Sequence, residues 1–558
     1  MELLLSLHSL FGIIGLAARH LQSAIISPEM DQKSKIAKAA GLMSVATFIS
    51  RVLGYIRDMI FAFYFGATGV SDTFFAAFRI PNLLRELFAE GSMSAAFIPV
   101  LTEYRQKQGE EEASRLVKIT FTFIIVVVGL VCVIGVLFAP AIVTIIAPGF
   151  LGSAEKFSLT VLLTRIMFPF LLFISLAALI MGALNTKKVF FIPALAPAML
   201  NITLIFSIIW FESKAKEPIT AAAIGVLAGG FVQFVFQLPA FFKNKYSLGL
   251  DTSFGHPGIK KMSVLLIPAT LALSVSQINI ALSNILASFL PSGSITYLFY
   301  SMRLIQFPIG IFGVAMGTAV LPTLSEHAVK GNFDGLRDDF SFALRVLFFI
   351  TIPAMAGLIA LRGPIINLLF QRGLFDHAAT KGTSEALLFY SLGIWAIVGV
   401  RVVTATFYSL QDTKTPVKIA VVGMISNVIC SLILMGPMKH SGLALANTLA
   451  ACINFSLLFY FLRKRLKRID AKKIIKSFLK ILIASAAMGV IGWMLLQGEL
   501  WSRSGELVAK SVYLGLTVVL LAGLYILFCL FLKAEELRLL WRLLLRRRRG
   551  LAKNSISM

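Results

Sequence analysis

The residues of this chain best suited to chemistry are arginines placed inside long apolar stretches. Arg51 and Arg57 share one such stretch, Arg85 lies in the next, and Arg303 lies in a later one. Each arginine offers five N–H donors in a planar fork that can grip a phosphate bidentately, and it keeps its charge when buried. Because an ionised residue in hydrocarbon costs roughly 2.5–3.5 kcal/mol, we expect these arginines to line a polar cavity that holds a phosphate or diphosphate.

Four further ionisable residues accompany these arginines and are expected to support or gate the site: Asp58, Asp72, Arg79 and Glu90. At about 100° per residue, Arg51 and Asp58 lie on nearly the same face of a helix, and Arg57 points about 120° away. An alternative is that the arginines form structural ion pairs with nearby acids, Arg51 with Asp58 and Arg79 with Glu86. The excess of arginine over acid favours anion binding for the group as a whole.

Other kinds of site find little support in the sequence. The six histidines form no HxxxH or HExxH pair, and the four cysteines lie in apolar segments without CxxC spacing, so we expect no metal and no cofactor. A nucleotide-binding GxxxxGK[ST] motif is also missing, so ATP-driven pumping would need a separate ATPase subunit. A cation/drug antiporter would favour acids rather than arginines in its cavity.

The elements that must position the arginines are membrane-spanning helices. The chain is 58% hydrophobic and only 14% charged, with a mean hydropathy of +0.86, which excludes a water-soluble fold. Hydrocarbon satisfies backbone groups only inside helices or closed barrels, and runs this long indicate helices. We predict an all-α polytopic membrane protein with spans at 35–65, 70–103, 119–147, 157–184, 190–211, 219–242, 263–290, 294–323, 340–361, 384–410, 416–436, 441–462, 475–497 and 511–532.

The net charge of +25 comes mainly from basic residues between the apolar runs, where loops meet lipid headgroups. We therefore expect no nucleic-acid partner. Lysines and arginines concentrate in alternate loops, including the RKRLKRIDAKKIIK run at 463–476 and the tail from 533 to 549. By the positive-inside rule, both termini are expected in the cytoplasm.

An internal repeat organises the chain. AFIPVLTEY at 96–104 matches AVLPTLSEH at 319–327, Arg79 corresponds to Arg303 at an offset of 224, and LNTKK at 184–188 resembles LQDTKTP at 410–416. The copies begin at the first and seventh spans, which makes them parallel repeats of six helices with two helices left over. The expected domains are an N-terminal lobe at 33–245, a C-terminal lobe at 246–465, a helix pair at 466–535 and a basic cytoplasmic tail at 536–558.

Three segments carry weaker signals. Residues 1–32 precede the pattern and are expected to be an extension that is non-native, dispensable or removed. The helix pair at 466–535 is either an outer groove for a lipid tail or a peripheral stabilising pair. Pro81 should bend the second span, and the glycines at 310, 313 and 317 put small residues on one face of the eighth, which suits close helix packing.

Several motifs together resemble the MurJ/MviN family, the lipid II flippases of bacterial peptidoglycan synthesis. The likeness runs from about residue 33 to the last span. It rests on SRVLGYIRD at 50–58, SDTFFAAFRIPNLLRELFAEGSMSAAFIPVLTEY at 71–104, APGF at 147–150, FPFLLFISLAALIMGALNT at 168–186, GVAMGTAVLPTLS at 313–325 and QDTKTPVKIA at 411–420.

The resemblance implies a fourteen-helix member of the multidrug/oligosaccharidyl-lipid/polysaccharide exporter superfamily in the bacterial inner membrane. Its substrate would be lipid II, the undecaprenyl-diphosphate-linked disaccharide pentapeptide, and it would make no covalent change. The family's essential arginines fall on Arg51, Arg57, Arg85 and Arg303, and two family acids fall on Asp58 and Asp72. Gln306 and Glu86 depart from the pattern of some members, and the family's proposed cation site has no convincing acid here, with Asn427 the nearest candidate.

The interpretation is thus a flippase for lipid II, with membrane lipids and cell-wall synthesis proteins as further partners. Two alternatives stay open on the residues alone. One is a flippase for another polyprenyl-diphosphate-linked glycan, since phosphate-gripping arginines do not identify the sugar. The other is a membrane-embedded lipid-phosphate enzyme, which is disfavoured because no loop offers an acidic pair or metal ligands.

Overall fold

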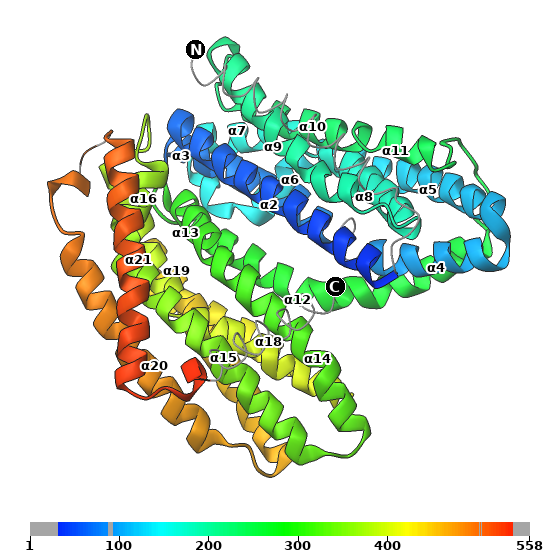
Figure 1. The fold of residues 1–558 in the computed structure, drawn as a ribbon. Coiled ribbons are helices and arrows are strands. Elements are labelled where there is room, and N and C mark those ends of the chain that lie inside the picture. The colour runs from blue at the N-terminus through cyan, green and yellow to red at the C-terminus, as the bar shows by residue number, and fades with distance from the viewer. Residues whose placement is uncertain (1–31, 88–92, 502, 504, 539–558) are drawn as a thin grey trace, which may run out of the picture.

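The computed structural model describes residues 32–87, 93–501, 503 and 505–538, and every regular element in these ranges is a helix (Figure 1). Ten of the described helical segments are long and apolar enough to cross a membrane. The predicted all-α polytopic fold is confirmed at this level. Glu90, the extension up to residue 31 and most of the expected tail lie outside the described residues.

The first half of the chain forms helices that lie along one side of the molecule, coloured blue to teal in Figure 1. They are α2 (Gln32–Phe65), α3 (Gly69–Leu84), α4 (Met93–Lys107), α5 (Gly109–Leu137), α6 (Ala139–Ile146), η2 (Pro148–Gly152), α7 (Ala154–Met167), α8 (Phe170–Thr186), α9 (Phe191–Phe211), η3 (Glu212–Lys214), α10 (Thr220–Val235) and α11 (Leu238–Lys243). Within this group α9 packs against α2 and α10, α8 packs against α5 and α10, and α3 packs against α7. We call α2–α11 the N-terminal helices.

The second half, coloured green to red, lies along the other side (Figure 1). Its elements are α12 (Pro257–Ala287), α13 (Ser294–Pro308), the π-helical turn η4 (Ile309–Gly313), α14 (Val314–Val329), α15 (Phe333–Ala360), α16 (Arg362–Phe370), α17 (His377–Ser391), α18 (Ile394–Ser409), α19 (Lys414–Leu466), α20 (Ala471–Leu495), η5 (Glu499–Trp501) and α21 (Leu507–Phe531). We call α12–α21 the C-terminal helices. α12 contacts both groups, since it packs against α4 and against α19.

The sequence repeat has a counterpart in the backbone. α3 runs through Pro81 to Leu84, and residues 85–87 then form a π-helical turn. In the second copy, α13 ends at Pro308 and the π-helical turn begins at residue 309, which is 224 residues after residue 85. Both copies thus place the same rare turn at the same register, just beyond a proline that removes a backbone donor.

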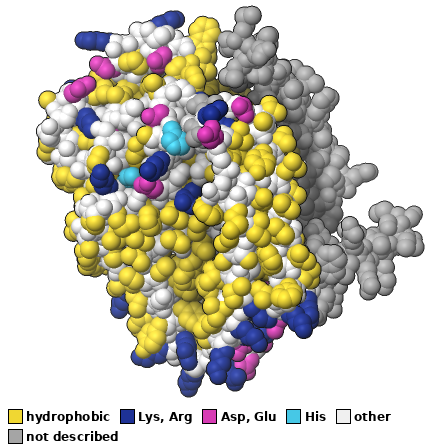
Figure 2. Space-filling model, turned by 90° about the vertical axis from the view of Figure 1, so that its left-hand side faces the viewer, with side chains coloured by type: hydrophobic (Ala, Val, Ile, Leu, Met, Phe, Trp, Pro, Cys, Tyr) yellow, Lys and Arg dark blue, Asp and Glu magenta, His cyan; other side chains and the backbone are white. Residues whose placement is uncertain are grey.

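The surface has the banding of a membrane protein. Seen from the side of α20 and α21, hydrophobic side chains form a broad belt, with a mainly basic edge below it and a mixed charged surface above it (Figure 2). An apolar surface of this extent is stable only against lipid. The chain is therefore a multi-pass membrane protein, as its composition predicts.

The two last spans are fastened to α15 by a buried ion pair. Arg345 of α15 donates to Glu536, 2.9 Å away, and both side chains are almost fully buried. Glu536 lies on a helical turn at 535–538, and its carboxylate also accepts a hydrogen bond from Ser477 of α20 at 2.9 Å. The first residues of the expected tail therefore fold back against the helices.

Removing one partner of this pair should destabilise the protein, because it leaves a buried charge uncompensated. We expect Glu536→Ala to lower the free energy of unfolding by about 3–5 kcal/mol, seen as a lower thermal midpoint in detergent micelles. The control is Glu535→Ala, whose carboxylate also lies near Arg345 but is 65% exposed, and which should cost less than about 1 kcal/mol. Equal losses in both variants would show that the buried pair has no special role.

Candidate functional site

The centre of the candidate site is the carboxylate of Asp58, which is 3% exposed. Arg57 donates to its Oδ1 from Nε at 2.9 Å and from Nη2 at 2.6 Å. Arg303 of α13 donates to its Oδ2 from Nε at 3.0 Å. One buried acid thus joins an arginine of the N-terminal helices to an arginine of the C-terminal helices.

Neighbouring side chains fix this arrangement. The Arg57 guanidinium also donates to Asn201 of α9 at 3.1 Å, and Asn201 in turn donates to the carbonyl of Ser50 at 3.1 Å. The Arg303 guanidinium lies 5.5 Å above the ring of Tyr55, a cation–π distance, and the Tyr55 hydroxyl donates to the Arg303 carbonyl. Hydrogen bonds and a ring therefore hold both guanidinium groups in place.

We call Arg57, Asp58 and Arg303 the Asp58 triad. Arg51 lies on α2 about two helical turns before Asp58 and makes no hydrogen bond or ion pair with another described residue. Its side chain is exposed, and its Nη1 lies 3.3 Å from the position that a Cβ of Gly310 would take. Glycine at 310 thus leaves room for the guanidinium against the π-helical turn η4. Arg51 does not pair with Asp58, so that alternative from the helix geometry is wrong.

A fifth arginine, Arg401 of α18, borders the same glycine face and escaped the sequence analysis. Its side chain is exposed and packs against Gly313 and Gly317, with Cδ 3.4 Å and Cβ 3.6 Å from where their Cβ atoms would be. No described residue makes a hydrogen bond or ion pair with it. The glycines at 310, 313 and 317 therefore receive two unpaired arginine side chains. An intramembrane arginine without a nearby acid was the signal available in the sequence.

Arg85 and Arg79 have different surroundings. Arg85 lies on the π-helical turn after α3, donates to Asn82 at 3.1 Å, and has its Nη2 3.7 Å from Glu86. Glu86 also accepts hydrogen bonds from Asn82 and from Gln277 of α12. Arg79 does not pair with Glu86 in this arrangement: its Nε and Nη2 are buried without a hydrogen-bond partner. Buried guanidinium donors without acceptors are costly, and an anion would satisfy these two.

Asp72 does not touch the arginines but caps a helix. Its Oδ2 accepts from the Gly293 N–H at 2.6 Å, and its Oδ1 accepts from the Thr296 N–H at 2.9 Å and the Thr296 hydroxyl at 2.7 Å. The carboxylate thus satisfies free donors at the N-terminus of α13 and complements its dipole. Because Asp72 lies on α3, this cap ties the two groups of helices together.

Two glycine contacts also join the N-terminal and C-terminal helices, at the end of the molecule where Asp72 caps α13. We call this end the junction end. Gly149 of η2 lies against the end of α12, where an added Cβ would come within 2.2 Å of the Ser288 carbonyl. Gly373 lies against the end of α2, where an added Cβ would come within 2.3 Å of the Phe63 carbonyl, and the next residue, Leu374, donates its N–H to that carbonyl at 2.9 Å. Residue 373 is 224 residues after 149, so each copy of the repeat makes the same contact with the other.

These residues together can bind an anion. Asp58 is shared by two arginines, Arg51 and Arg401 have no acid, and Arg79 has unsatisfied donors. The described residues contain no cluster of three His, Cys, Asp or Glu side chains able to hold a metal ion.

Comparisons with known proteins identify the family of this chain. The family profile described as lipid II flippase MurJ matches residues 61–512. The chain belongs to the MurJ family. A probable lipid II flippase MurJ of Vibrio cholerae is 37% identical over 485 residues, covering 86% of this chain and 92% of that protein. A lipid II flippase MurJ of Burkholderia cenocepacia is 34% identical and covers 86% and 94%.

Solved structures extend the comparison. A structure of lipid II flippase MurJ in an inward closed conformation has a TM-score of 0.71 at 29% identity, covering 87% of this chain and 98% of that one. An inward-facing multidrug resistance MATE transporter of the MOP superfamily has a TM-score of 0.63 at 15% identity, covering 75% and 94%. The second likeness shows the fold alone. MurJ proteins are transporters, and this chain is a transporter rather than an enzyme.

The cap on α13 generates a test. In Asp72→Asn, an amide N–H₂ replaces one acceptor oxygen and faces a backbone donor, so we expect a loss of about 1–3 kcal/mol of stability. Hydrogen exchange of the peptide around 293–297, followed by mass spectrometry, should quicken. The control Thr296→Val removes only the hydroxyl bond and should have a smaller effect. Unchanged exchange in Asp72→Asn would contradict the capping role.

Proposed function

We propose that this chain moves lipid II across the bacterial inner membrane by alternating access and makes no covalent change in it. The observation that carries the proposal is the excess of guanidinium groups over carboxylates where the N-terminal and C-terminal helices meet. A diphosphate has the charge and the acceptor oxygens that these groups lack. Membership in the MurJ family supports lipid II as the molecule that carries this diphosphate.

The proposed diphosphate site consists of Arg51, Arg57, Arg85 and Arg303, with Arg401 added from the structure. Asp58, Asp72 and Arg79 are proposed as supporting or gating residues. Glu90 keeps this role as an expectation from sequence. We propose that the diphosphate competes with Asp58 for Arg57 and Arg303, so that substrate binding exchanges one set of ion pairs for another. Such a difference in contacts between states is what allows a ligand to shift a conformational equilibrium.

We infer a fourteen-helix arrangement of two six-helix lobes, at 33–245 and 246–465, followed by the pair at 466–535. Ten described segments have the length and hydropathy of spans. α19 has a non-helical residue at Lys439 and supplies two spans of the expected fourteen, and α2, the α3–α4 pair and α12 lie in the three remaining expected ranges. The π-helical turns and the glycine contacts at an offset of 224 support two equivalent lobes.

The orientation follows from charge. We propose cytoplasmic termini, including the tail beyond residue 536, because the basic loops lie at the end opposite the junction end. The junction end then faces outward, and its glycine contacts close the outer side. Opening that side would require the contacts of Gly149 and Gly373 to separate together with the Asp58 triad.

The proposed site predicts which arginines are required for transport. In a bacterium depleted of its own lipid II flippase, we expect Arg57→Ala and Arg303→Ala to abolish delivery of lipid II to the outer leaflet. Arg57→Lys should restore only part of it, because an ammonium lacks the bidentate fork. The control is Arg165→Ala, an exposed arginine of α7 whose Nε bonds to the Val136 carbonyl. Full rescue by both alanine variants would refute the site assignment.

The nearest alternative is transport of another polyprenyl-diphosphate-linked glycan, because the arginines recognise the diphosphate rather than the sugar. Binding of lipid II by the purified protein, compared with binding of other undecaprenyl-linked glycans, separates the two. Membrane lipids surround the protein in either case. Cell-wall synthesis proteins are proposed partners on the grounds of the substrate alone.

A further inference from the structure

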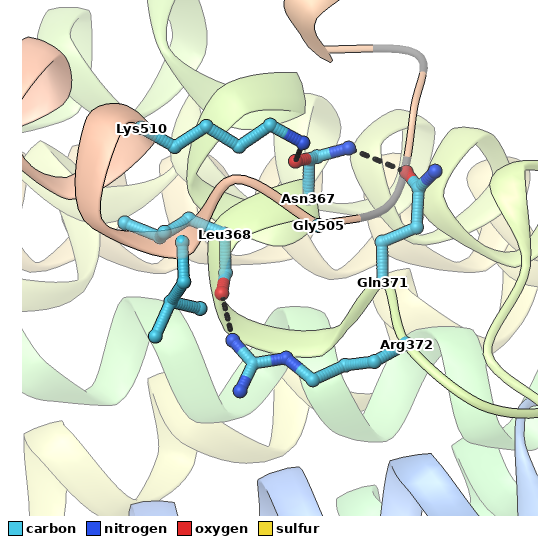
Figure 3. A pocket seen from close by; sticks show the side chains of 7 residues that line it. Asn367, Leu368, Gln371, Arg372, Gly505 and Lys510 are labelled. Atoms are coloured by element: carbon cyan, nitrogen blue, oxygen red, sulfur yellow. Dashed lines mark hydrogen bonds between the residues drawn. The ribbon is translucent and has the colours of Figure 1, made fainter.

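A second cationic site lies at the junction end, away from the Asp58 triad. A cavity of about 140 Å³ opens between the last turn of α16 and the start of α21. Figure 3 shows Lys510 on one side of this cavity and Arg372 on the other, with Asn367 and Gln371 completing a polar wall. We call it the Lys510 pocket. Neither cation entered the sequence analysis of the substrate site.

Lys510 is the unusual group of this pocket, because its side chain is 2% exposed and forms no ion pair within 4 Å of a described carboxylate. The nearby charge of Glu506 acts on it only at longer range. Its Nζ donates to Asn367 Oδ1 at 2.9 Å and to the Arg503 carbonyl at 2.5 Å. Both acceptors are neutral, and an ammonium has three donors. Since a buried charge is costly unless it is paired, the pocket has an unmet demand for negative charge.

Arg372 adds a second positive charge with donors to spare. Its Nη2 donates to the Leu368 carbonyl, and its other N–H groups have no acceptor among the described residues. The lining of the Lys510 pocket includes no acid. Glu499 and Glu506 line a second hollow, which Lys510 also borders, and there Glu499 is paired with Arg503 at 2.6 Å.

We propose that the Lys510 pocket binds a phosphate group, carried by an anionic phospholipid headgroup or free in solution. A planar guanidinium and an ammonium on opposite walls suit the several oxygens of a phosphate. The lipid source fits the position, because Leu507 lines the pocket and, with Val508 and Val512, begins an exposed apolar face along α21. A headgroup in the pocket would place its acyl chain along that face.

The experiment measures the thermal unfolding midpoint of the full chain in nonionic detergent. One arm adds inorganic phosphate against chloride at matched ionic strength, and the other adds phosphatidylglycerol against phosphatidylcholine to the micelles. A ligand that binds only the folded state stabilises it by RT ln(1 + L/Kd), where L is the free ligand concentration, so the midpoint rises with the ligand concentration relative to the Kd. We expect Arg372→Gln, at a partly exposed position, to weaken the apparent affinity about tenfold, the effect of losing one charge-assisted hydrogen bond.

The control variant is Arg165→Gln, at an exposed arginine of α7 outside the pocket, and it should keep the full response. Lys510→Met should abolish the rise in the unfolding midpoint. If this variant fails to fold, the response of Arg372→Gln alone tests the proposal. A response to phosphatidylglycerol alone assigns the site to lipid, and a response to inorganic phosphate alone assigns it to a soluble anion. The proposal is overturned if neither ligand raises the midpoint, or if Arg372→Gln responds as strongly as the parent chain.

Discussion

The buried carboxylate of Asp58 is the interaction on which the arrangement of this membrane protein depends. Removing a carboxylate from water is costly unless opposite charge and hydrogen bonds compensate it, and Asp58 obtains both from Arg57 on its own helix and from Arg303 on α13. One acid cannot neutralise two guanidinium groups. The triad therefore keeps a net positive charge, and Arg51 and Arg401 add to it from either side of the glycine face. The contact that joins the two groups of helices is also the centre of the proposed anion site.

α13 is the element through which these forces act together. Asp72 holds its N-terminus, Asp58 holds its middle through Arg303, and the π-helical turn η4 follows directly after Pro308. A π-helical turn contains backbone hydrogen bonds of unusual register, which makes it a place where a helix can change direction at small cost. Arg51 lies against this turn at Gly310. An anion held by Arg51 and Arg303 would thus lie close to this adaptable turn, because Arg303 precedes the turn on α13 and Arg51 packs against Gly310 within it.

Sequence patterns predicted the helical fold, the repeat and each of Arg51, Arg57, Arg85, Arg303, Asp58 and Asp72 as notable residues. The pairing of these side chains was less accessible. Helix geometry places residues 57 and 58 on different faces, yet a long arginine side chain folds back to its neighbour, and Arg303 approaches from a distant helix. Asp72 was singled out, but its partner, the start of α13, lies more than 200 residues away and is found only by folding. Arg401 and Lys510 were missed because neither belongs to a motif or to the arginine-rich first two spans, and their significance comes from the residues that surround them in the fold.

The reciprocal glycines at the junction end constrain how this protein can evolve. Gly149 and Gly373 occupy corresponding positions at the offset of 224 residues, and each rests on the backbone of the other half with no room for a Cβ. A larger residue at one of them cannot be accommodated by a change at the other, because the two contacts are separate and each meets main-chain atoms. The same steric requirement therefore applies twice and independently, and each half needs a residue without a side chain at this place.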